Sequence, residues 1–271
     1  MDPTIILIGC GKMGMSLLNG WIDNGHEKNN IIVIETDNKV CEILNNKSIK
    51  NYTDLSLIEI KNKNLIFIFA IKPQAIDEVL AKFVKLQFRD AIYLSIVAGI
   101  KVSYISQYLG KGKSIFRAMP NIAAEVGRSM TAIYKNEFCL EKDSSYIESL
   151  LNSVGESIWL KSEAEIDIVT AISGSGPAYF FYMTECLINA GCDMGLSREM
   201  AEQLAVQTLL GSSRLLDFTK KNPETLRNNV TSKGGTTEAA LDVLKDKRDF
   251  EKILKKATLA AKKRSEQLSE K

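Results

Sequence analysis

The feature that most constrains the fold of this chain is a glycine-rich turn between a predicted strand and a predicted helix. Residues Thr4–Ile8 form a short, apolar, β-branched run, which is typical of a buried strand. Residues 13–21 show helical spacing of apolar side chains. The turn between them reads Gly9-Cys10-Gly11-Lys12-Met13-Gly14.

In this setting the GxGxxG pattern predicts a dinucleotide cofactor site rather than an ordinary glycine turn, because each glycine has a physical task. Gly9 permits the tight turn, Gly11 lets the backbone approach a pyrophosphate, and Gly14 lets the helix pack closely on the sheet. The start of the helix adds free N–H groups and the positive end of the helix dipole. All six residues of the turn are therefore expected to face the cofactor.

The first half of the chain continues to alternate between strands and helices. Further strands are predicted at Ile31–Ile34, 65–71, 91–97, 114–117 and 130–134, and helices at 40–44 and Ile76–Leu86. Buried strands that alternate with helices indicate an α/β Rossmann-type domain with a parallel-rich, doubly wound sheet. This sheet should run to about residue 160.

The second half shows helical patterns and almost no strand pattern. Helices are predicted at 177–190, 197–218, 237–244 and 250–268, and a further helix begins with Asn222 as N-cap and Pro223 at its first position. A length of 271 residues suits two domains. We therefore expect a dinucleotide-binding domain over residues 1–160 and an all-α domain over residues 161–271.

Composition excludes several classes of function. The chain has 35 Lys and Arg against 33 Asp and Glu, which leaves no charge pattern for nucleic acid or a membrane surface. The longest apolar run, 65–71, is far too short to cross a membrane. Five cysteines without a CxxC pair and a single histidine, His26, predict neither disulfides nor a metal site. The expected partner is a small soluble molecule, and the expected location is the cytoplasm.

The end of the second strand bears on the choice between NAD and NADP. Glu35 stands 21 residues after Gly14, where an acid binds the hydroxyls of the adenosine ribose. NADP-binding proteins usually place a basic residue just beyond, but Thr36 and Asp37 follow here. We therefore expect NADH to be used at least as well as NADPH. The alternative is that Glu35 is only a solvated acid at a strand end.

Three more loops leave predicted strands at their carboxyl ends, where ligands bind in open α/β sheets. They contain Ala70-Ile71-Lys72-Pro73, Ala98-Gly99 and Arg117-Ala118-Met119-Pro120-Asn121. Lys72 is placed to reach the phosphates or ribose of the cofactor, and Asn121 to hold its nicotinamide side. Each residue alone is an ordinary loop residue, but together they predict a cofactor-facing rim.

The helical half carries two glycine-rich segments, and each leads directly into a helix. They read Ser173-Gly174-Ser175-Gly176-Pro177-Ala178-Tyr179 and Ser232-Lys233-Gly234-Gly235-Thr236-Thr237. Helix starts with hydroxyls and exposed amides suit a small carboxylate. One such segment would be no more than a capped helix start, but two in one domain favour a substrate pocket.

These segments together resemble the pyrroline-5-carboxylate reductase family over nearly the whole chain. The resemblance lies in residues 9–14, 71–73, 117–121, 173–179 and 234–237, and the last two segments are specific to that family. It implies reduction of the C=N bond of Δ1-pyrroline-5-carboxylate by NADPH or NADH in proline biosynthesis. It also implies a homodimer with interleaved C-terminal helices, and leaves open a higher assembly of such dimers.

The resemblance also implies particular substrate contacts in the helical domain. The positions that match are Glu163, Asn229, Ser232, Thr236 and Thr237, and we add Ser175, Gly176, Gly234 and Gly235 from the glycine-rich segments. Two residues depart from the family pattern. Lys233 replaces the usual proline and adds a charge near the predicted anion site, and Glu35 replaces a neutral or basic residue.

The implied chemistry asks little of the protein. The cofactor supplies hydride, and a protonated imine already accepts it readily, so the protein supplies position and electrostatics. We expect the amides and hydroxyls of residues 232–237 to hold the substrate carboxylate. Thr237 is expected to act as the catalytic residue by bonding the ring nitrogen and handling its proton.

Two other functions share features with this sequence. A 3-hydroxyacid dehydrogenase shares the two-domain plan, but its family uses a lysine early in the helix that follows Gly176, where this chain has Phe180. A non-catalytic NAD(P)H-binding regulator would bind the cofactor without turnover. Both remain alternatives at the level of sequence.

Overall fold

A computed structural model describes residues 3–58, 64–86, 88 and 90–269 of the chain. The chain divides into two compact units. The first comprises Met1–Ser175 together with Ala261–Lys271, and the second comprises Gly176–Ala260. These units differ from the expected division at residue 160, because the first unit continues to Ser175 and also includes the end of the last helix.

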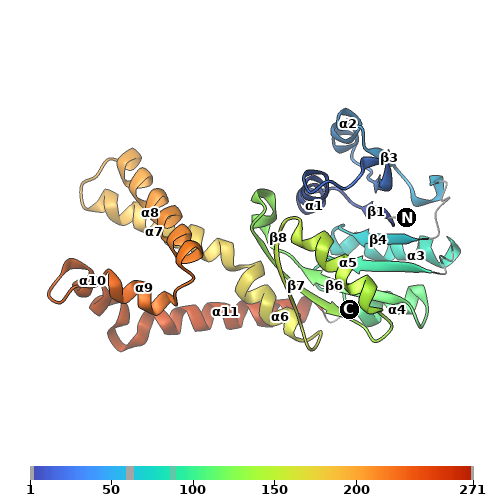
Figure 1. Cartoon of the computed structure of the whole chain (residues 1–271). Helices are drawn as coiled ribbons and strands as arrows, with labels where there is room; N and C mark the ends of the chain where they lie inside the picture. The colour runs from blue at the N-terminus through green and yellow to red at the C-terminus, as the bar shows by residue number, and fades with distance from the viewer. Residues whose placement is uncertain (1–2, 59–63, 87, 89, 270–271) are drawn as a thin grey trace. The chain divides into compact units, whose positions relative to one another are not determined.

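The first unit is built on an eight-stranded sheet within the described residues, in the order β3-β2-β1-β4-β5-β6-β7-β8 (Figure 1). The strands are β1 (Thr4–Ile8), β2 (Ile31–Ile34), β3 (Lys50–Tyr52), β4 (Leu65–Phe69), β5 (Ala91–Ser95), β6 (Ser114–Met119), β7 (Ser129–Lys135) and β8 (Gly155–Trp159). All neighbouring strands are parallel except β6 and β7. The expected Rossmann-type, parallel-rich sheet is confirmed.

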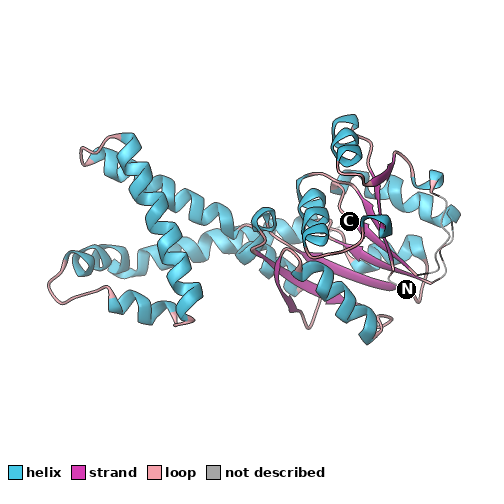
Figure 2. Cartoon of the chain, turned by 45° about the horizontal axis from the view of Figure 1, so that its top comes forward, coloured by secondary structure: helices cyan, strands magenta, loops and turns pink. Residues whose placement is uncertain are grey.

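Helices cover both faces of this sheet (Figure 2). They are α1 (Lys12–Asp23), α2 (Asn38–Asn46), α3 (Ile76–Leu86), α4 (Val102–Leu109) and α5 (Glu141–Asn152), with short helical turns at Lys28–Asn30, Leu55–Leu57, Pro73–Ala75 and Ile122–Val126. Strand β1 is apolar throughout because both of its faces are buried. Ile5 and Leu7 join the core beneath α1 and α5, whereas Ile6 and Ile8 join the core beneath α3 and α4.

The order of the strands in the sheet places a possible cofactor site at the carboxyl ends of the strands, which we call the cofactor edge. Strand β1 lies between β2 and β4, so the connections that leave it and its neighbours run to opposite sides of the sheet. Ligands bind at such a switch point, outside the carboxyl ends of the strands. The turn after β1 and the loops after β2, β4 and β5 lie at this edge.

The first unit also contains a segment that follows β8. It consists of α6 (Glu165–Val169) and a π-helical turn (Thr170–Gly174). The Ser175 N–H closes this turn by donating to the Thr170 carbonyl oxygen at 2.8 Å. Single π-helical turns inside or beside α-helices are often found at functional sites.

The second unit is helical, as expected. It contains α7 (Gly176–Asp193), α8 (Arg198–Thr219), α9 (Pro223–Asn229), α10 (Thr236–Lys245), a short turn (Asp246–Arg248) and the first part of α11 (Asp249–Leu268). The N-cap of α9 is confirmed, because the Asn222 side chain accepts a 2.7 Å hydrogen bond from the Glu224 N–H. No helix in the described ranges is long and apolar enough to span a bilayer.

The helical unit buries little of its own apolar surface. Its core among the described side chains consists of Ile188, Ala201 and Ala205. Many large apolar side chains of α7 and α8 are exposed, among them Phe181 at 62%, Leu210 at 56% and Phe218 at 87%. A single copy of this unit therefore leaves extensive apolar faces uncovered.

Candidate active site

The glycine-rich turn has the geometry that the sequence predicts. Gly9 has φ of +87°, and a Cβ added there would lie 2.6 Å from Ile71 Cγ2 and 2.7 Å from the Ala70 carbonyl oxygen. Its N–H donates to the Ile34 carbonyl oxygen at 2.8 Å. Only glycine fits this turn, which lies between the ends of β2 and β4.

Gly14 and Gly11 have different surroundings. A Cβ on Gly14 would lie 2.5 Å from the Gly9 carbonyl oxygen, so α1 packs directly on the turn. Around Gly11, by contrast, the described atoms leave open space at the Cβ position. Gly11 is the N-cap of α1, and among the described residues no side chain caps that helix. The start of α1 at Lys12 and Met13 therefore offers unblocked amides, which suit a pyrophosphate.

The Glu35 carboxylate is bonded to the backbone at the end of β2. Its Oε2 accepts from the Cys10 N–H at 2.7 Å, and its Oε1 accepts from the N–H groups of Thr36 at 2.6 Å and Asp37 at 2.9 Å. These bonds join the acid directly to the glycine-rich turn. They place negative charge on the side of the turn where the adenosine ribose is expected.

Burial governs the thiol beside this carboxylate. Cys10 is 1% exposed. Burial, followed by the nearby Glu35 and then Cys41, raises its pKa to about 12. The thiol of Cys10 is therefore a packing group of the turn in its protonated form.

The loops after β4 and β5 lie at the same edge as the glycine-rich turn. Lys72 is exposed and precedes the helical turn that begins at Pro73. Ala98 is exposed, whereas Gly99 is buried with φ of +74°. A Cβ on Gly99 would lie 2.6 Å from the carbonyl oxygen of Leu268 at the end of α11, so this loop contacts the returning C-terminal helix.

Asn121 links two of the predicted motifs. Its Nδ2 donates to the Ser173 carbonyl oxygen at 3.0 Å, and its Oδ1 accepts from the Ala123 N–H at 3.1 Å. Beside it, a Cβ on Gly174 would lie 2.9 Å from Met119 Cε. The segment 117–121 therefore packs against the π-helical turn, and the Asn121 side chain bonds protein groups.

Glu163, expected among the substrate contacts, bonds two groups of the first unit. Its Oε1 accepts from Arg117 Nη1 at 2.8 Å and from the Val102 N–H at 2.8 Å. The Arg117 side chain is 4% exposed and that of Glu163 is 21% exposed. Sequence reasoning did not find this pair, because its partners stand 46 positions apart and belong to different elements.

The second glycine-rich segment forms a closed turn before α10. Gly234 has φ of +73°, and a Cβ on Gly235 would lie 2.5 Å from Ser232 Oγ. The Gly234 N–H donates to Glu238 Oε2 at 2.6 Å, a contact that the sequence analysis did not propose. Thr236 and Thr237 begin α10, and Asn229 ends α9.

The first glycine-rich segment falls across the boundary of the two units. Ser175 is the last residue of the first unit's main segment, and Gly176 begins α7 in the second unit. The predicted substrate residues are thus distributed over both units.

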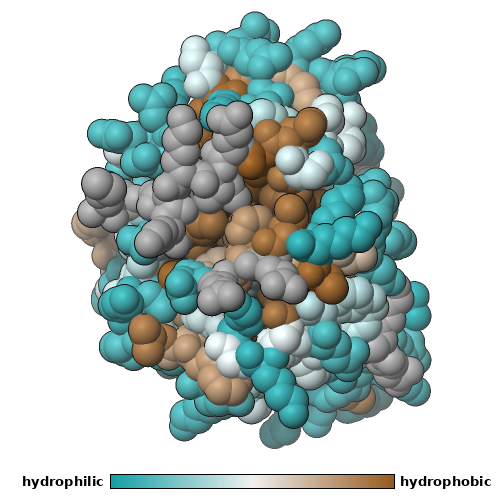
Figure 3. Space-filling model, turned by 90° about the vertical axis from the view of Figure 1, so that its right-hand side faces the viewer, coloured by the Kyte–Doolittle hydropathy of each residue, from teal (hydrophilic) through white to brown (hydrophobic). Residues whose placement is uncertain are grey.

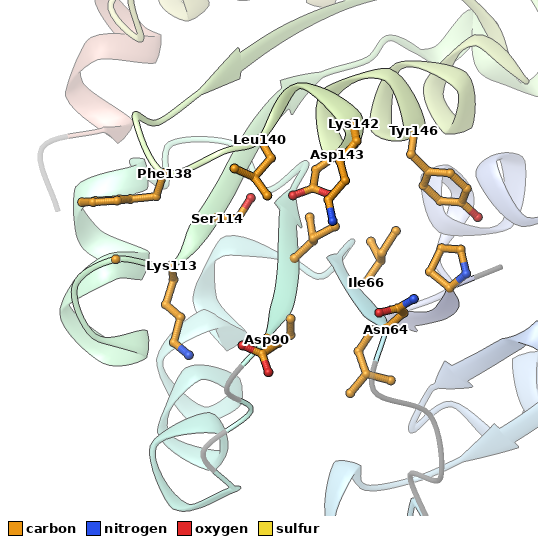
Figure 4. Close-up of a pocket in the computed structure, with 15 residues that line it drawn as sticks. Asn64, Ile66, Asp90, Lys113, Ser114, Phe138, Leu140, Lys142, Asp143 and Tyr146 are labelled. Carbon is orange, nitrogen blue, oxygen red and sulfur yellow. The ribbon is translucent and has the colours of Figure 1, made fainter. Parts of the chain in front are cut away.

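One cavity of the first unit lies away from the cofactor edge. It has a volume of about 540 Å³ and is lined by residues at the amino ends of β1, β4, β5 and β6, among them Asn64, Asp90 and Lys113, and by residues of α5 such as Lys142 (Figure 4). Figure 3 shows hydrophobic residues gathered among hydrophilic ones on the face of the molecule that it draws. In the part of the chain that the structure describes, no cluster of His, Cys, Asp and Glu is arranged to hold a metal ion.

A doubly wound sheet with a GxGxxG turn at its switch point and an acid at the end of β2 defines a Rossmann-type, nicotinamide-dependent oxidoreductase. Residues 4–99 match the family described as NADP oxidoreductase coenzyme F420-dependent. Residues 163–268 match the family described as pyrroline-5-carboxylate reductase dimerisation.

The chain belongs to the pyrroline-5-carboxylate reductase family. It is 33% identical to the pyrroline-5-carboxylate reductase of Haemophilus influenzae over 268 residues, which cover 97% of each chain. The solved pyrroline-5-carboxylate reductase of Coxiella burnetii matches with a TM-score of 0.93 and 32% identity over 100% of both chains. The Plasmodium falciparum pyrroline carboxylate reductase with NADP bound matches with a TM-score of 0.84 and 27% identity, over 99% of this chain and 98% of that one.

Proposed function

We propose that this chain reduces Δ1-pyrroline-5-carboxylate to L-proline with NADH or NADPH as the hydride donor. The observation that carries the proposal is the full-length match to pyrroline-5-carboxylate reductases, which includes both the cofactor turn and the dimerisation segment. A 3-hydroxyacid dehydrogenase activity is not favoured, because Phe180 stands where that chemistry would need a lysine.

The reduced nicotinamide supplies hydride to the imine carbon when it is bound. The protein's part is to hold the substrate. The amides and hydroxyls of Ser232, Gly234, Gly235 and Thr236 are suited to the carboxylate, since they gather at the positive end of α10. The Gly234 amide is held by Glu238 in the free chain, so the substrate carboxylate competes with that side chain.

Thr237 is the proposed catalytic residue. It lies in the first turn of α10 and is half-buried. Its hydroxyl would hydrogen-bond the ring nitrogen of the protonated imine, which keeps its proton and takes up the electron pair of the C=N bond as hydride adds to carbon, while position supplies most of the acceleration. The other proposed contacts of the substrate are Ser175, Gly176 and Asn229. Glu163 matched a substrate contact in the sequence, but its Oε1 already accepts from Arg117 and from the Val102 N–H, so it is left out of this set.

The proposed cofactor contacts are the turn of residues 9–14, Glu35, Ala70, Ile71, Lys72, Pro73, Ala98, Gly99 and Asn121. Glu35 and Asp37 carry two negative charges just after β2, which would disfavour a 2′-phosphate on the adenosine ribose. We therefore propose that NADH is used at least as well as NADPH. A kcat/KM for NADPH more than about tenfold above that for NADH would contradict this proposal.

The chain forms a homo-oligomer in this proposal, and the C-terminal helices of two copies interleave in a dimer. The exposed apolar faces of α7 and α8 support it, because a second copy would remove them from water. The proposed roles of residues 161–271, which the structure divides between both units, are substrate binding and dimerisation, and the family match over 163–268 supports the dimerisation role. The cytoplasm is the proposed location, since all five cysteines are free thiols.

The direct test is a steady-state assay with pyrroline-5-carboxylate and each reduced cofactor, followed by the loss of absorbance at about 340 nm. We expect turnover with both cofactors and proline as the product. Quenching of NADH fluorescence without oxidation of NADH would instead indicate a cofactor-binding regulator.

A further inference from the structure

We propose that Glu163 and Arg117 are positioning residues that hold the loop of residues 96–101 in the shape that binds the nicotinamide half of the cofactor. The inference rests on the proposed function, because that function assigns Ala98 and Gly99 to the cofactor. It gives Glu163 a role that acts through the loop rather than on the substrate.

The order of strands places this loop beside the nicotinamide half. The pyrophosphate belongs at the start of α1, after β1, and the Glu35 carboxylate marks the adenosine side at the end of β2. The other half of the cofactor must therefore extend to the opposite side, over β4 and β5. The loop of residues 96–101 leaves β5 at this edge and leads into α4.

One oxygen atom joins three elements around this loop. Glu163 Oε1 accepts from the Val102 N–H, at the start of α4, and from Arg117 Nη1, on β6. The first N–H groups of a helix have no partner within the helix, and a carboxylate is favourable at that end. Arg117 is buried and therefore holds the carboxylate in a fixed place. The end of the loop is thus tied to the segment before α6.

A second contact holds the middle of the loop. The end of α11 lies against Gly99, where a Cβ would be 2.6 Å from the Leu268 carbonyl oxygen. That end of α11 is bonded to α6, because Ser265 Oγ donates to Asp167 Oδ1 at 2.6 Å. Figure 1 shows the C-terminal end of α11 beside α6. Glu163 and Asp167 belong to one short segment, so this segment holds the loop at two points.

The charges explain why a change at Glu163 would move the loop. Removing one partner of a buried ion pair leaves the other charge uncompensated. Without Glu163, the Arg117 guanidinium must seek water or another acceptor, and the Val102 N–H loses its bond. The loop would then lose the fixed position that cofactor binding requires, and a displacement of about 1 Å can cost a hundredfold in rate.

The experiment separates cofactor binding from substrate binding in the full-length protein. Variants Glu163→Gln and Glu163→Ala are compared with Glu141→Gln, which breaks the exposed ion pair with Lys135 in the same unit. The dissociation constant for NADH is measured by fluorescence without substrate. The KM for the imine is measured separately at saturating NADH.

We expect Glu163→Gln to weaken NADH binding about three- to tenfold and Glu163→Ala more than tenfold, with less than a threefold change in the KM for the imine. Glu141→Gln should leave both values unchanged. An increased KM for the imine with unchanged NADH binding would overturn the proposal and make Glu163 a substrate contact. Unchanged values in Glu163→Gln would also overturn it.

Two features keep the test decisive. If Glu163→Ala does not fold, Glu163→Gln retains an acceptor oxygen of the same size and still gives the NADH dissociation constant. Failure of the proposed reaction would show as wild-type protein that binds NADH without turnover. In that case the NADH dissociation constants alone still decide the role of Glu163.

Discussion

Thr237 is the residue on which the proposed chemistry depends most directly. Replacing it with alanine removes the hydroxyl from the first turn of α10 but keeps a good helix former. We expect kcat/KM to fall about tenfold to a thousandfold, which corresponds to about 1.4–4 kcal/mol. Thr237→Ser is the control, because it keeps the hydroxyl. An unchanged kcat/KM in folded Thr237→Ala protein would exclude Thr237 from the mechanism.

Glu35 offers a test of cofactor choice at the scale of one side chain. Its two oxygens occupy the N–H groups of Cys10, Thr36 and Asp37. Glu35→Ser removes the negative charge and frees these donors for a 2′-phosphate. We expect the ratio of kcat/KM for NADPH to that for NADH to rise by about tenfold or more. A ratio that stays the same would show that Glu35 does not discriminate between the cofactors.

Cys10 makes a prediction about pH. Its folded pKa is raised to about 12, above the ordinary value of a thiol. The corresponding contribution to stability is therefore fully present below about pH 9 and is lost as pH rises toward 12. At pH 8 iodoacetamide should label Cys10 only in denaturant, as measured by peptide mass spectrometry. Rapid labelling in the folded protein would show that the thiol is accessible.

Variants of Gly14 and Gly11 distinguish the packing of α1 from contact with the cofactor. Gly14→Ala would place a Cβ 2.5 Å from the Gly9 carbonyl oxygen, so α1 must shift, and we expect a loss of about 1–3 kcal/mol in stability. Gly11→Ala meets open space and should leave the melting temperature nearly unchanged, while it weakens NADH binding. Equal melting temperatures for the two variants would contradict the assigned packing roles.

Elements with a strong apolar pattern could be predicted from the sequence. The strands β1, β2 and β4 and the helix α3 are examples, because their side chains face cores on the sheet. Strands β3 and β8 were missed as elements, because they lie at the edges of the sheet and few of their side chains are buried.

In the candidate site, too, some features could be predicted from the local sequence and others could not. The motif was sufficient to predict the tight turn at Gly9 and the close packing of α1 at Gly14, whereas the cofactor contact of Gly11 stays a prediction. The bonds of Glu163 and Asn121 join residues that are distant in sequence, and only the fold brings their partners together. The contact of Glu238 with Gly234 is local, and helix-capping rules offered a signal for it.

At the scale of the whole molecule, the exposed helical faces predict assembly. We expect sedimentation of a dimer or larger species, and a melting temperature that rises with protein concentration. Leu210→Glu on α8 should shift the protein toward monomer, whereas Val84→Glu, at a similarly exposed position on α3, should not. Monomeric wild-type protein at micromolar concentration would contradict the proposed dimer.

Helix α11 begins in the second unit and ends in the first, where Leu268 covers Gly99. During translation the sheet and its loops leave the ribosome long before this cover is made. In the nascent chain the loop after β5 therefore stays exposed to solvent until the whole helical unit has been synthesised. A protein expressed only as residues 1–175 would lack the contact between Leu268 and Gly99. Adding a separate peptide of residues 261–269 is a way to restore this contact.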